Sequence, residues 1–203
     1  MMRFVLATAN PDKATEIDAV LRESGVPVAL EPRDPSLPDV DETGATLEEN
    51  ARLKAIDACV RSGLAAIADD TGLEVDALGG APGVRSARFA GAGASYADNV
   101  ALLLERLTNV PESERTARFA TVAIARWPDG REVAALGTVE GTISRTPRGV
   151  GGFGYDPVFV PTEGDGRTFA EMRPEEKHAC SHRGRAFRTL AEGLRTLVST
   201  TET

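Results

Sequence analysis

The chain opens with RFVLATANPDK at residues 3–13, an apolar run that ends in a polar turn. The apolar run is typical of a β-strand, whereas Asn10 is a favoured helix N-cap and Pro11 suits the first helical position. Apolar residues then recur at helical spacing up to Gly25, and a second apolar run covers residues 26–30. The chain therefore opens as strand, tight turn, helix and strand, which is the pattern of an α/β unit.

The same patterns predict the remaining elements. Thr46-Leu47-Glu48-Glu49 forms a capping box that begins a helix ending near Ser62. We expect further elements as follows: an apolar stripe Leu53, Ile56 and Val60 on that helix, a strand over 65–68 that stops at Asp69-Asp70-Thr71-Gly72, a helix begun by Ser95 and Asp98, strands over 115–127 and 131–143 joined at Pro128-Asp129-Gly130, a strand over 158–160, and helices begun at Pro174 and Ser181. These elements predict one α/β domain over residues 1–203 with two lobes around a cleft.

Composition limits the class of protein. Hydrophobic residues make up 41% and charged residues 27% of the chain, as in ordinary globular proteins. A net charge of −8 argues against a general nucleic-acid binder, although a local cationic cluster can still bind a small anion. The sequence has two cysteines, no apolar run long enough to span a membrane and no signal peptide, so we expect a cytoplasmic protein.

Lysines are rare and therefore informative. The chain has 23 basic residues, of which only Lys13, Lys54 and Lys177 are lysines. Lys13 lies in the first helical turn after the polar turn, where the helix dipole and free backbone N–H groups attract an anion such as phosphate. Lys54 follows Asn50 by four residues, so both side chains share one helix face and can address one ligand.

Two acidic residues follow the buried strand at 65–68. Asp69 and Asp70 point in alternate directions, so one of them can face a ligand while the other supports it. Carboxylates at this position suit a hard cation such as Mg²⁺. A solvated turn is the alternative interpretation.

The C-terminal third contains two further segments with chemistry. A glycine-rich stretch ends in Phe153-Gly154-Tyr155-Asp156, where an aromatic ring beside a bare backbone offers a stacking face for a base. Residues 176–186 hold Lys177 and both histidines of the chain, and Ser181-His182-Arg183 places several hydrogen-bond donors at a helix start.

Read jointly, these segments resemble one family. The matching blocks run in order from residue 7 to residue 184 and include ATANPDK at 7–13, IADDTGL at 67–73, GFGYDP at 152–157 and SHRG at 181–184. The chain resembles the inosine triphosphate pyrophosphatase family, which includes the bacterial dITP/XTP pyrophosphatases. The resemblance implies an elongated mixed central sheet with flanking helices, two lobes around an active-site cleft and a homodimer.

The resemblance also implies a reaction and its residues. Such enzymes hydrolyse dITP, ITP and XTP to the monophosphate and pyrophosphate, with one Mg²⁺ for each subunit. By resemblance Asp70 is the general base and, with Asp41, a Mg²⁺ ligand. Relatives often have Glu at the Asp41 position, and because Asp is shorter by one methylene, a water-bridged contact or coordination by Glu42 stays open as the alternative. The residues expected to bind substrate are Thr8, Ala9, Asn10, Pro11, Asp12 and Lys13 at the phosphates, Thr71, then Phe153, Gly154, Tyr155 and Asp156 at the base, and Lys177, His182 and Arg183 toward its 6-oxo group.

Two alternatives stay open. A related pyrophosphatase with another base preference, such as modified pyrimidines, would share the phosphate site. A non-catalytic nucleotide-binding module would need both binding sites but no acid for chemistry, and the presence of Asp69 and Asp70 counts against it.

Overall fold

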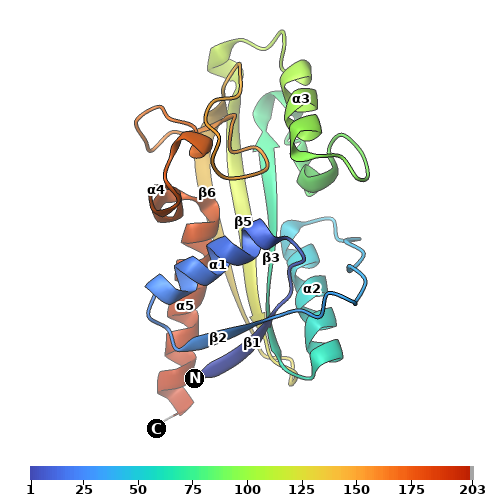
Figure 1. Cartoon of the computed structure of the whole chain (residues 1–203), viewed down its shortest axis with the longest axis vertical. Helices are drawn as coiled ribbons and strands as arrows, with labels where there is room; N and C mark the ends of the chain where they lie inside the picture. The colour runs from blue at the N-terminus through green and yellow to red at the C-terminus, as the bar shows by residue number, and fades with distance from the viewer. Residues whose placement is uncertain (202–203) are drawn as a thin grey trace. The chain divides into compact units, whose positions relative to one another are not determined.

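The computed structural model describes the backbone of residues 1–201 and the side chains up to Leu197. Within this range the helices and strands are β1 (Met2–Leu6), α1 (Pro11–Glu23), β2 (Val28–Pro32), α2 (Leu47–Ser62), β3 (Ala65–Val75), β4 (Pro82–Gly83), α3 (Tyr96–Arg106), β5 (Thr116–Arg126), β6 (Glu132–Ile143), β7 (Phe159–Pro161), α4 (Pro174–Cys180) and α5 (His182–Thr201), all coloured along the chain in Figure 1. No helix among the described residues has the length and apolar content needed to cross a bilayer.

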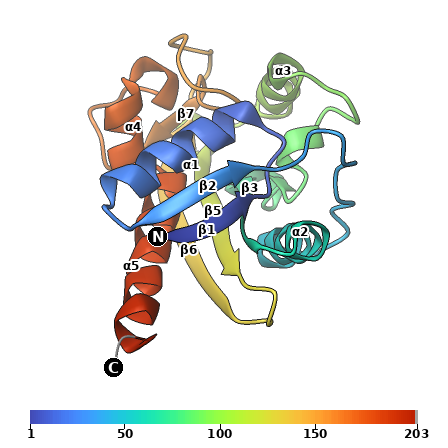
Figure 2. The same ribbon diagram turned by 60° about the horizontal axis from the view of Figure 1, so that its bottom comes forward.

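The strands form one mixed sheet. Their order is β2-β1-β3-β5-β6-β7, and β4 pairs with β3. The strand β1 is parallel to β2 and β3, whereas β3–β4 and β6–β7 are antiparallel pairs. Figure 2 shows β1 and β2 side by side, as their register requires. The prediction of an α/β fold with a mixed sheet and flanking helices is confirmed.

The chain forms two compact units. The first contains Met1–Asp70, Thr121–Gly137 and the described residues from Arg183 onward, and the second contains Thr71–Ala120 and Thr138–His182. The chain passes from one unit to the other four times. Two of these passages lie at residues predicted to act at the site, between Asp70 and Thr71 and between His182 and Arg183. One catalytic domain over residues 1–203, with a cleft between two lobes, remains a prediction.

The core of the first unit explains why α1 and α5 pack on the sheet. Their apolar faces bury Ile17 and Val20 from α1 and Phe187, Leu190 and Leu194 from α5, each no more than 1% exposed. Full burial of one such side chain contributes about 1.5–3 kcal/mol relative to exposure. The predicted α1 start is confirmed, since the Asn10 side chain accepts from the backbone N–H groups of the first turn.

The second unit has its own core. Its members come from β3, α3, β5, β6 and β7 and from the segments around them: Leu73, Val75, Val100, Leu103, Leu107, Ala117, Phe119, Val139, Ile143, Tyr155, Val158, Phe159 and Phe169. Phe119 packs on Phe159 with ring centroids 4.7 Å apart. The predicted α3 start is also confirmed, because Ser95 and Asp98 form a capping box.

The predicted apolar stripe of α2 is wrong. Val60 is 78% exposed and Ile56 is 37% exposed. The helix instead buries Ala51, Ala55 and Cys59, which recur every four residues. Small side chains let α2 approach the sheet closely, where Ala7, Ala68 and Ile124 complete the cluster. Short side chains at helical spacing, rather than the largest apolar ones, mark its packed face.

The predicted end of the third strand is also wrong. The strand β3 does not stop at Asp69 but continues to Val75, so both aspartates lie inside a strand. Their carboxylates are buried and each is paired with cations, which removes the reason to expect a solvated turn there.

Candidate active site

The turn before α1 has the N-cap predicted at Asn10, but this cap bonds two of the backbone N–H groups that were expected to be free. The Asn10 Oδ1 atom accepts from the backbone N–H of Asp12 at 2.9 Å and of Lys13 at 3.3 Å, and Thr8 Oγ1 accepts from the N–H of Asn10 at 3.2 Å. Ala9, Pro11 and Asp12 are exposed. Because Asn10 already bonds two of the N–H groups, the attraction offered to an anion comes chiefly from the helix dipole and Lys13.

A buried ion-pair network joins this turn to β3 and α5. Lys13 Nζ lies 3.0 Å from Asp69 Oδ2, and Arg183 Nη2 lies 3.6 Å from the same oxygen. Arg183 Nη1 donates to Glu16 Oε2 at 2.5 Å. Burial alone would raise the pKa of Asp69, but the charges of Lys13 and Arg183 outweigh it and hold the pKa below its usual range. Asp69 is therefore an anion that holds two cations in place.

The second aspartate has different partners. Asp70 Oδ1 accepts from Lys54 Nζ at 2.9 Å, and Oδ2 accepts from Asn50 Nδ2 at 3.3 Å. Burial raises the pKa of Asp70, and Lys54 opposes that shift only in part. The prediction that Asn50 and Lys54 share one helix face is confirmed, since both contact this carboxylate. Asp70 is thus a more basic carboxylate than its neighbour Asp69.

An acidic loop approaches the same lysine. Glu42 Oε1 accepts from Lys54 Nζ at 3.1 Å, so the carboxylates of Glu42 and Asp70 converge on one ammonium group. The Gly44 N–H donates to Asn50 Oδ1 at 2.8 Å, and a Cβ at Gly44 would lie 2.6 Å from that oxygen. Asp41, one residue before Glu42, is exposed. The structure therefore brings Glu42 to Lys54, the lysine that Asp70 also binds.

In the second unit, one carboxylate organises the glycine-rich turn. Asp156 Oδ2 accepts from the Phe153 N–H at 2.8 Å and from Lys177 Nζ at 2.5 Å. The Lys177 ammonium also lies 4.8 Å from the centroid of the Phe153 ring, a cation–π contact. A Cβ at Gly152 would lie 2.0 Å from Asp156 Oδ2, so this close packing requires glycine. These contacts bring Phe153, Asp156 and Lys177 together.

The remaining residues predicted to bind substrate differ in how far they are buried. The Tyr155 hydroxyl donates to the Ser86 carbonyl at 2.9 Å inside the core, so its side chain supports the turn. His182 is 2% exposed and stacks on Phe119 with ring centroids 4.4 Å apart. Gly154 has a positive φ of 61°, and Thr71 is half-buried in β3.

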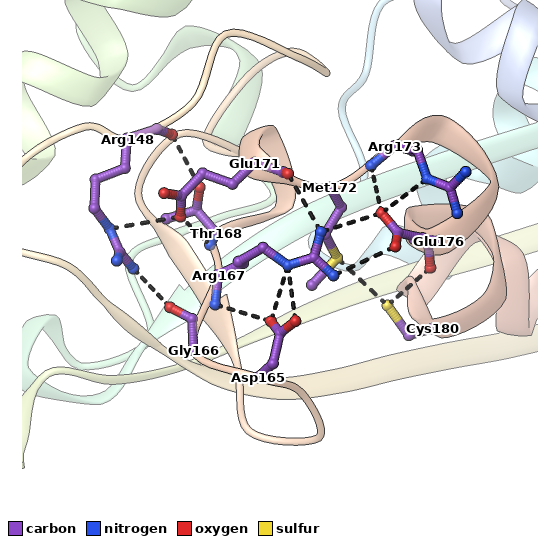
Figure 3. A network of polar contacts seen from close by, with 10 residues as sticks. All are labelled: Arg148, Asp165, Gly166, Arg167, Thr168, Glu171, Met172, Arg173, Glu176 and Cys180. Carbon is purple, nitrogen blue, oxygen red and sulfur yellow. Dashed lines mark hydrogen bonds and ion pairs between the residues drawn. The ribbon is translucent and has the colours of Figure 1, made fainter.

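An ion-pair network fixes the start of α4, which carries Lys177. Figure 3 shows Arg167 between Asp165 and Glu176, with Arg173 on the far side of Glu176. Arg167 Nη1 lies 3.1 Å from Glu176 Oε2, and the Arg173 N–H donates to that oxygen at 2.8 Å. These contacts lower the pKa of Glu176 to about 2, with Arg167 as the main cause. The first turn of α4 is therefore anchored immediately before Lys177.

Sequence reasoning missed Glu16 as a site residue and gave Asp69 only a supporting role. A buried arginine such as Arg183 requires an anionic partner, but the sequence offers 31 acidic residues and does not identify which one. The one available signal is that Glu16 follows Lys13 by three residues, which places both on neighbouring positions of α1.

Comparison with known proteins gives consistent matches over the whole chain. A dITP/XTP pyrophosphatase of Streptomyces avermitilis is 48% identical over 200 residues, covering 98% of this chain and 100% of the relative. A dITP/XTP pyrophosphatase of Mycobacteroides abscessus is 46% identical, covering 98% of this chain and 97% of the relative. Among solved structures, a HAM1 protein from Coxiella burnetii has a TM-score of 0.86 at 41% identity, covering 97% of this chain and all of that one.

The family model described as the Ham1 family matches residues 4–193, which include every residue predicted here to act at the site. This match agrees with the resemblance given by the sequence motifs. With a family model over nearly the whole chain and relatives above 40% identity, the chain belongs to the Ham1 family.

Proposed function

We propose that this protein hydrolyses dITP, ITP and XTP to the nucleoside monophosphate and pyrophosphate. The observation that carries the proposal is the polar cluster of the first unit. In this cluster the buried carboxylate of Asp70 lies beside Lys54. The preceding residue, Asp69, pairs with Lys13 and Arg183. The names of the relatives, dITP/XTP pyrophosphatases at 46–48% identity, support the same reaction.

Lys13 and the turn before α1 bind the triphosphate in this proposal. The turn from Thr8 to Lys13 places the positive end of the α1 dipole beside one ammonium group. The cations Lys13, Lys54 and Arg183 gather there, but each is paired with carboxylates, so a bound divalent cation would supply further positive charge for the polyanion. Catalysis then depends on positioning and on stabilising charge at the departing pyrophosphate.

Asp70 accepts a proton from the water that attacks the α-phosphorus. Its carboxylate suits this role because burial raises its pKa, while Lys54 and Asn50 fix its orientation. Thr71, which follows Asp70 in the same strand, provides a hydroxyl for the substrate.

The residues present fit a bound Mg²⁺ ion. Magnesium is usually held by one or two carboxylates together with substrate phosphates, and the carboxylates of Asp70 and Glu42 converge on Lys54. We assign these two as its ligands. The chemistry that such a cation supplies when bound is neutralisation of phosphate charge and acidification of water. Asp41, the position that the resemblance indicates, remains a predicted ligand that an Asp41→Asn variant tests by metal titration.

The second unit binds the base. Phe153 stacks on the purine, Gly154, Tyr155 and Asp156 shape the turn beneath it, and Lys177 and His182 donate toward the 6-oxo group. The resemblance also predicts Arg183 as a donor to the base. A 6-amino group would place donors against donors, and such unpaired polar groups give strong discrimination.

The experiment that tests this function compares ITP, XTP, GTP, dTTP and UTP side by side with Mg²⁺ present. We expect ITP and XTP to be the fastest substrates and to yield pyrophosphate. Faster turnover of a pyrimidine would favour a pyrophosphatase of different base preference, and binding without turnover would favour a non-catalytic module. Release of orthophosphate would contradict the proposal.

Removal of divalent cations gives a second expected outcome. Treatment with excess EDTA should reduce pyrophosphate release to background, and added Mg²⁺ should restore it, because the phosphates need a hard cation beside Asp70. Continuous measurement of pyrophosphate release in both conditions checks this. Full activity in EDTA would contradict the metal assignment while leaving the substrate assignment standing.

We also propose that the chain acts as a homodimer in the cytoplasm, on the strength of the family resemblance. Light scattering coupled to size-exclusion chromatography measures the molecular mass directly and so tests whether the protein is a dimer.

A further inference from the structure

Tyr96 is a large aromatic residue in an unusual place. It occupies the first position of α3, is 42% exposed and contacts Phe153, with ring centroids 5.8 Å apart and a tilt of 40° between the rings. Both residues belong to the second unit. Tyrosine combines an apolar ring with a polar hydroxyl, so one side chain can pack on another aromatic ring and still be partly exposed to solvent.

The structure holds Tyr96 in this position. Asp98 N–H donates to Ser95 Oγ at 3.2 Å and Ser95 N–H donates to Asp98 Oδ2 at 2.9 Å, which fixes the start of α3. Asn99 then ties the preceding loop to the helix, since its side chain accepts from the Ala90 N–H at 2.8 Å and donates to the Ala87 carbonyl at 3.2 Å. The ring therefore projects from a helix end with a defined geometry.

The neighbouring ring is fixed independently. Phe153 is anchored by its backbone bond to Asp156, and Lys177 lies over its face. Two aromatic rings from distant parts of the sequence, each on a braced backbone, thus meet at one point. The planes of the two rings are tilted by 40°, so the rings do not form one flat surface.

We propose that Tyr96 is a specificity-determining residue that extends the base platform of Phe153 and favours purines over pyrimidines. The inference rests on the proposed function, in which the base stacks on Phe153. A bicyclic purine extends beyond one phenyl ring, so its far edge reaches the tilted ring of Tyr96. A monocyclic pyrimidine on the same phenyl ring does not reach it. Tyr96 therefore adds contact only for the larger base.

The test compares Tyr96→Ala with wild type in hydrolysis of ITP and UTP. Because truncation to alanine removes the aromatic ring that the purine touches, we expect the KM for ITP to rise about tenfold with kcat little changed. The KM for UTP should not change. Tyr96→Phe should recover most of the affinity for ITP, because the ring rather than the hydroxyl makes the contact. Glu105→Ala, an exposed change on the same helix, is the matched control.

Binding measurements separate this inference from the proposed function. Calorimetry should show inosine monophosphate binding to Tyr96→Ala about tenfold more weakly, with pyrophosphate binding unchanged. An unchanged or lower KM for ITP, an equal loss for UTP, or an equal loss of pyrophosphate binding would overturn the role of Tyr96. If wild type fails to release pyrophosphate from ITP, the proposed function fails, and inosine monophosphate binding still decides whether Tyr96 contacts a purine.

Discussion

The Asp70→Asn variant should lose about 10³-fold in kcat for pyrophosphate release from ITP, since general-base groups contribute roughly 10²–10⁴-fold. Asparagine has the shape of aspartate and can keep a hydrogen bond to Lys54 or Asn50, but it cannot accept the proton from water. The two residues that hold Asp70 come from α2, whose capping box and glycine end are independent of the change. The fold should therefore survive, which circular dichroism and thermal melting can establish.

A substitution at the surface, Asp18→Asn, is the control for the loss of kcat expected in Asp70→Asn. Asp18→Asn removes a carboxylate of the same unit, but the Asp18 side chain is 43% exposed and pairs with Arg22 one turn away on α1. Such exposed pairs contribute about 0–1 kcal/mol, so activity and stability should match wild type. If Asp70→Asn keeps more than about a tenth of wild-type kcat, the loss is too small for a general base and Asp70 does not have that role.

Local signals predict most of the fold. The caps at Asn10, Thr46 and Ser95 act through hydrogen bonds that span three residues, and all three helix starts lie where the sequence indicates. The turn near residues 128–130 likewise joins β5 and β6. These features are predictable because each depends only on residues adjacent in the chain.

The two wrong predictions, the buried face of α2 and the end of β3, both depend on contacts with residues far away in the sequence. The buried face of α2 is set by the sheet beneath it, on which the small side chains of Ala51 and Ala55 pack, while Cys59 is buried on the same helix. The strand β3 continues past two buried carboxylates whose cations come from α1, α2 and α5, and its later residues pair with β4. The sequence of the strand itself does not identify those partners.

Part of the candidate site is likewise predictable from the sequence, and part is not. The motifs identified which segments carry chemistry, including Lys13 and Lys177, because residue types and order are visible in the sequence. Pairing did not follow from them: Glu16 with Arg183, and Glu42 with Lys54, are contacts made only once the first unit is folded. The rarity of lysine proved informative, since each of the three lysines pairs with an aspartate.

The largest effect on stability should come from Asp69→Asn. The change leaves the buried cations of Lys13 and Arg183 without the carboxylate that lies 3.0 Å and 3.6 Å from them. Breaking a buried pair on one side costs about 3–5 kcal/mol, a large part of the roughly 5–15 kcal/mol that keeps a typical domain folded. Denaturant titration at pH 7 measures the difference in unfolding free energy from wild type.

The dependence of this difference on pH distinguishes the charge of Asp69 from its shape. The folded-state pKa of Asp69 is lowered, so its stabilising contribution is complete above the unfolded-state pKa of about 3.9 and is lost as pH falls toward the folded-state value. The gap between wild type and Asp69→Asn should stay constant from about pH 8 to pH 5 and shrink below about pH 4. Asp57→Asn, which removes the partner of Arg61 on α2, should show almost no gap. A gap for Asp69→Asn that persists unchanged in acid would mean that packing, rather than ionisation, is what the aspartate provides.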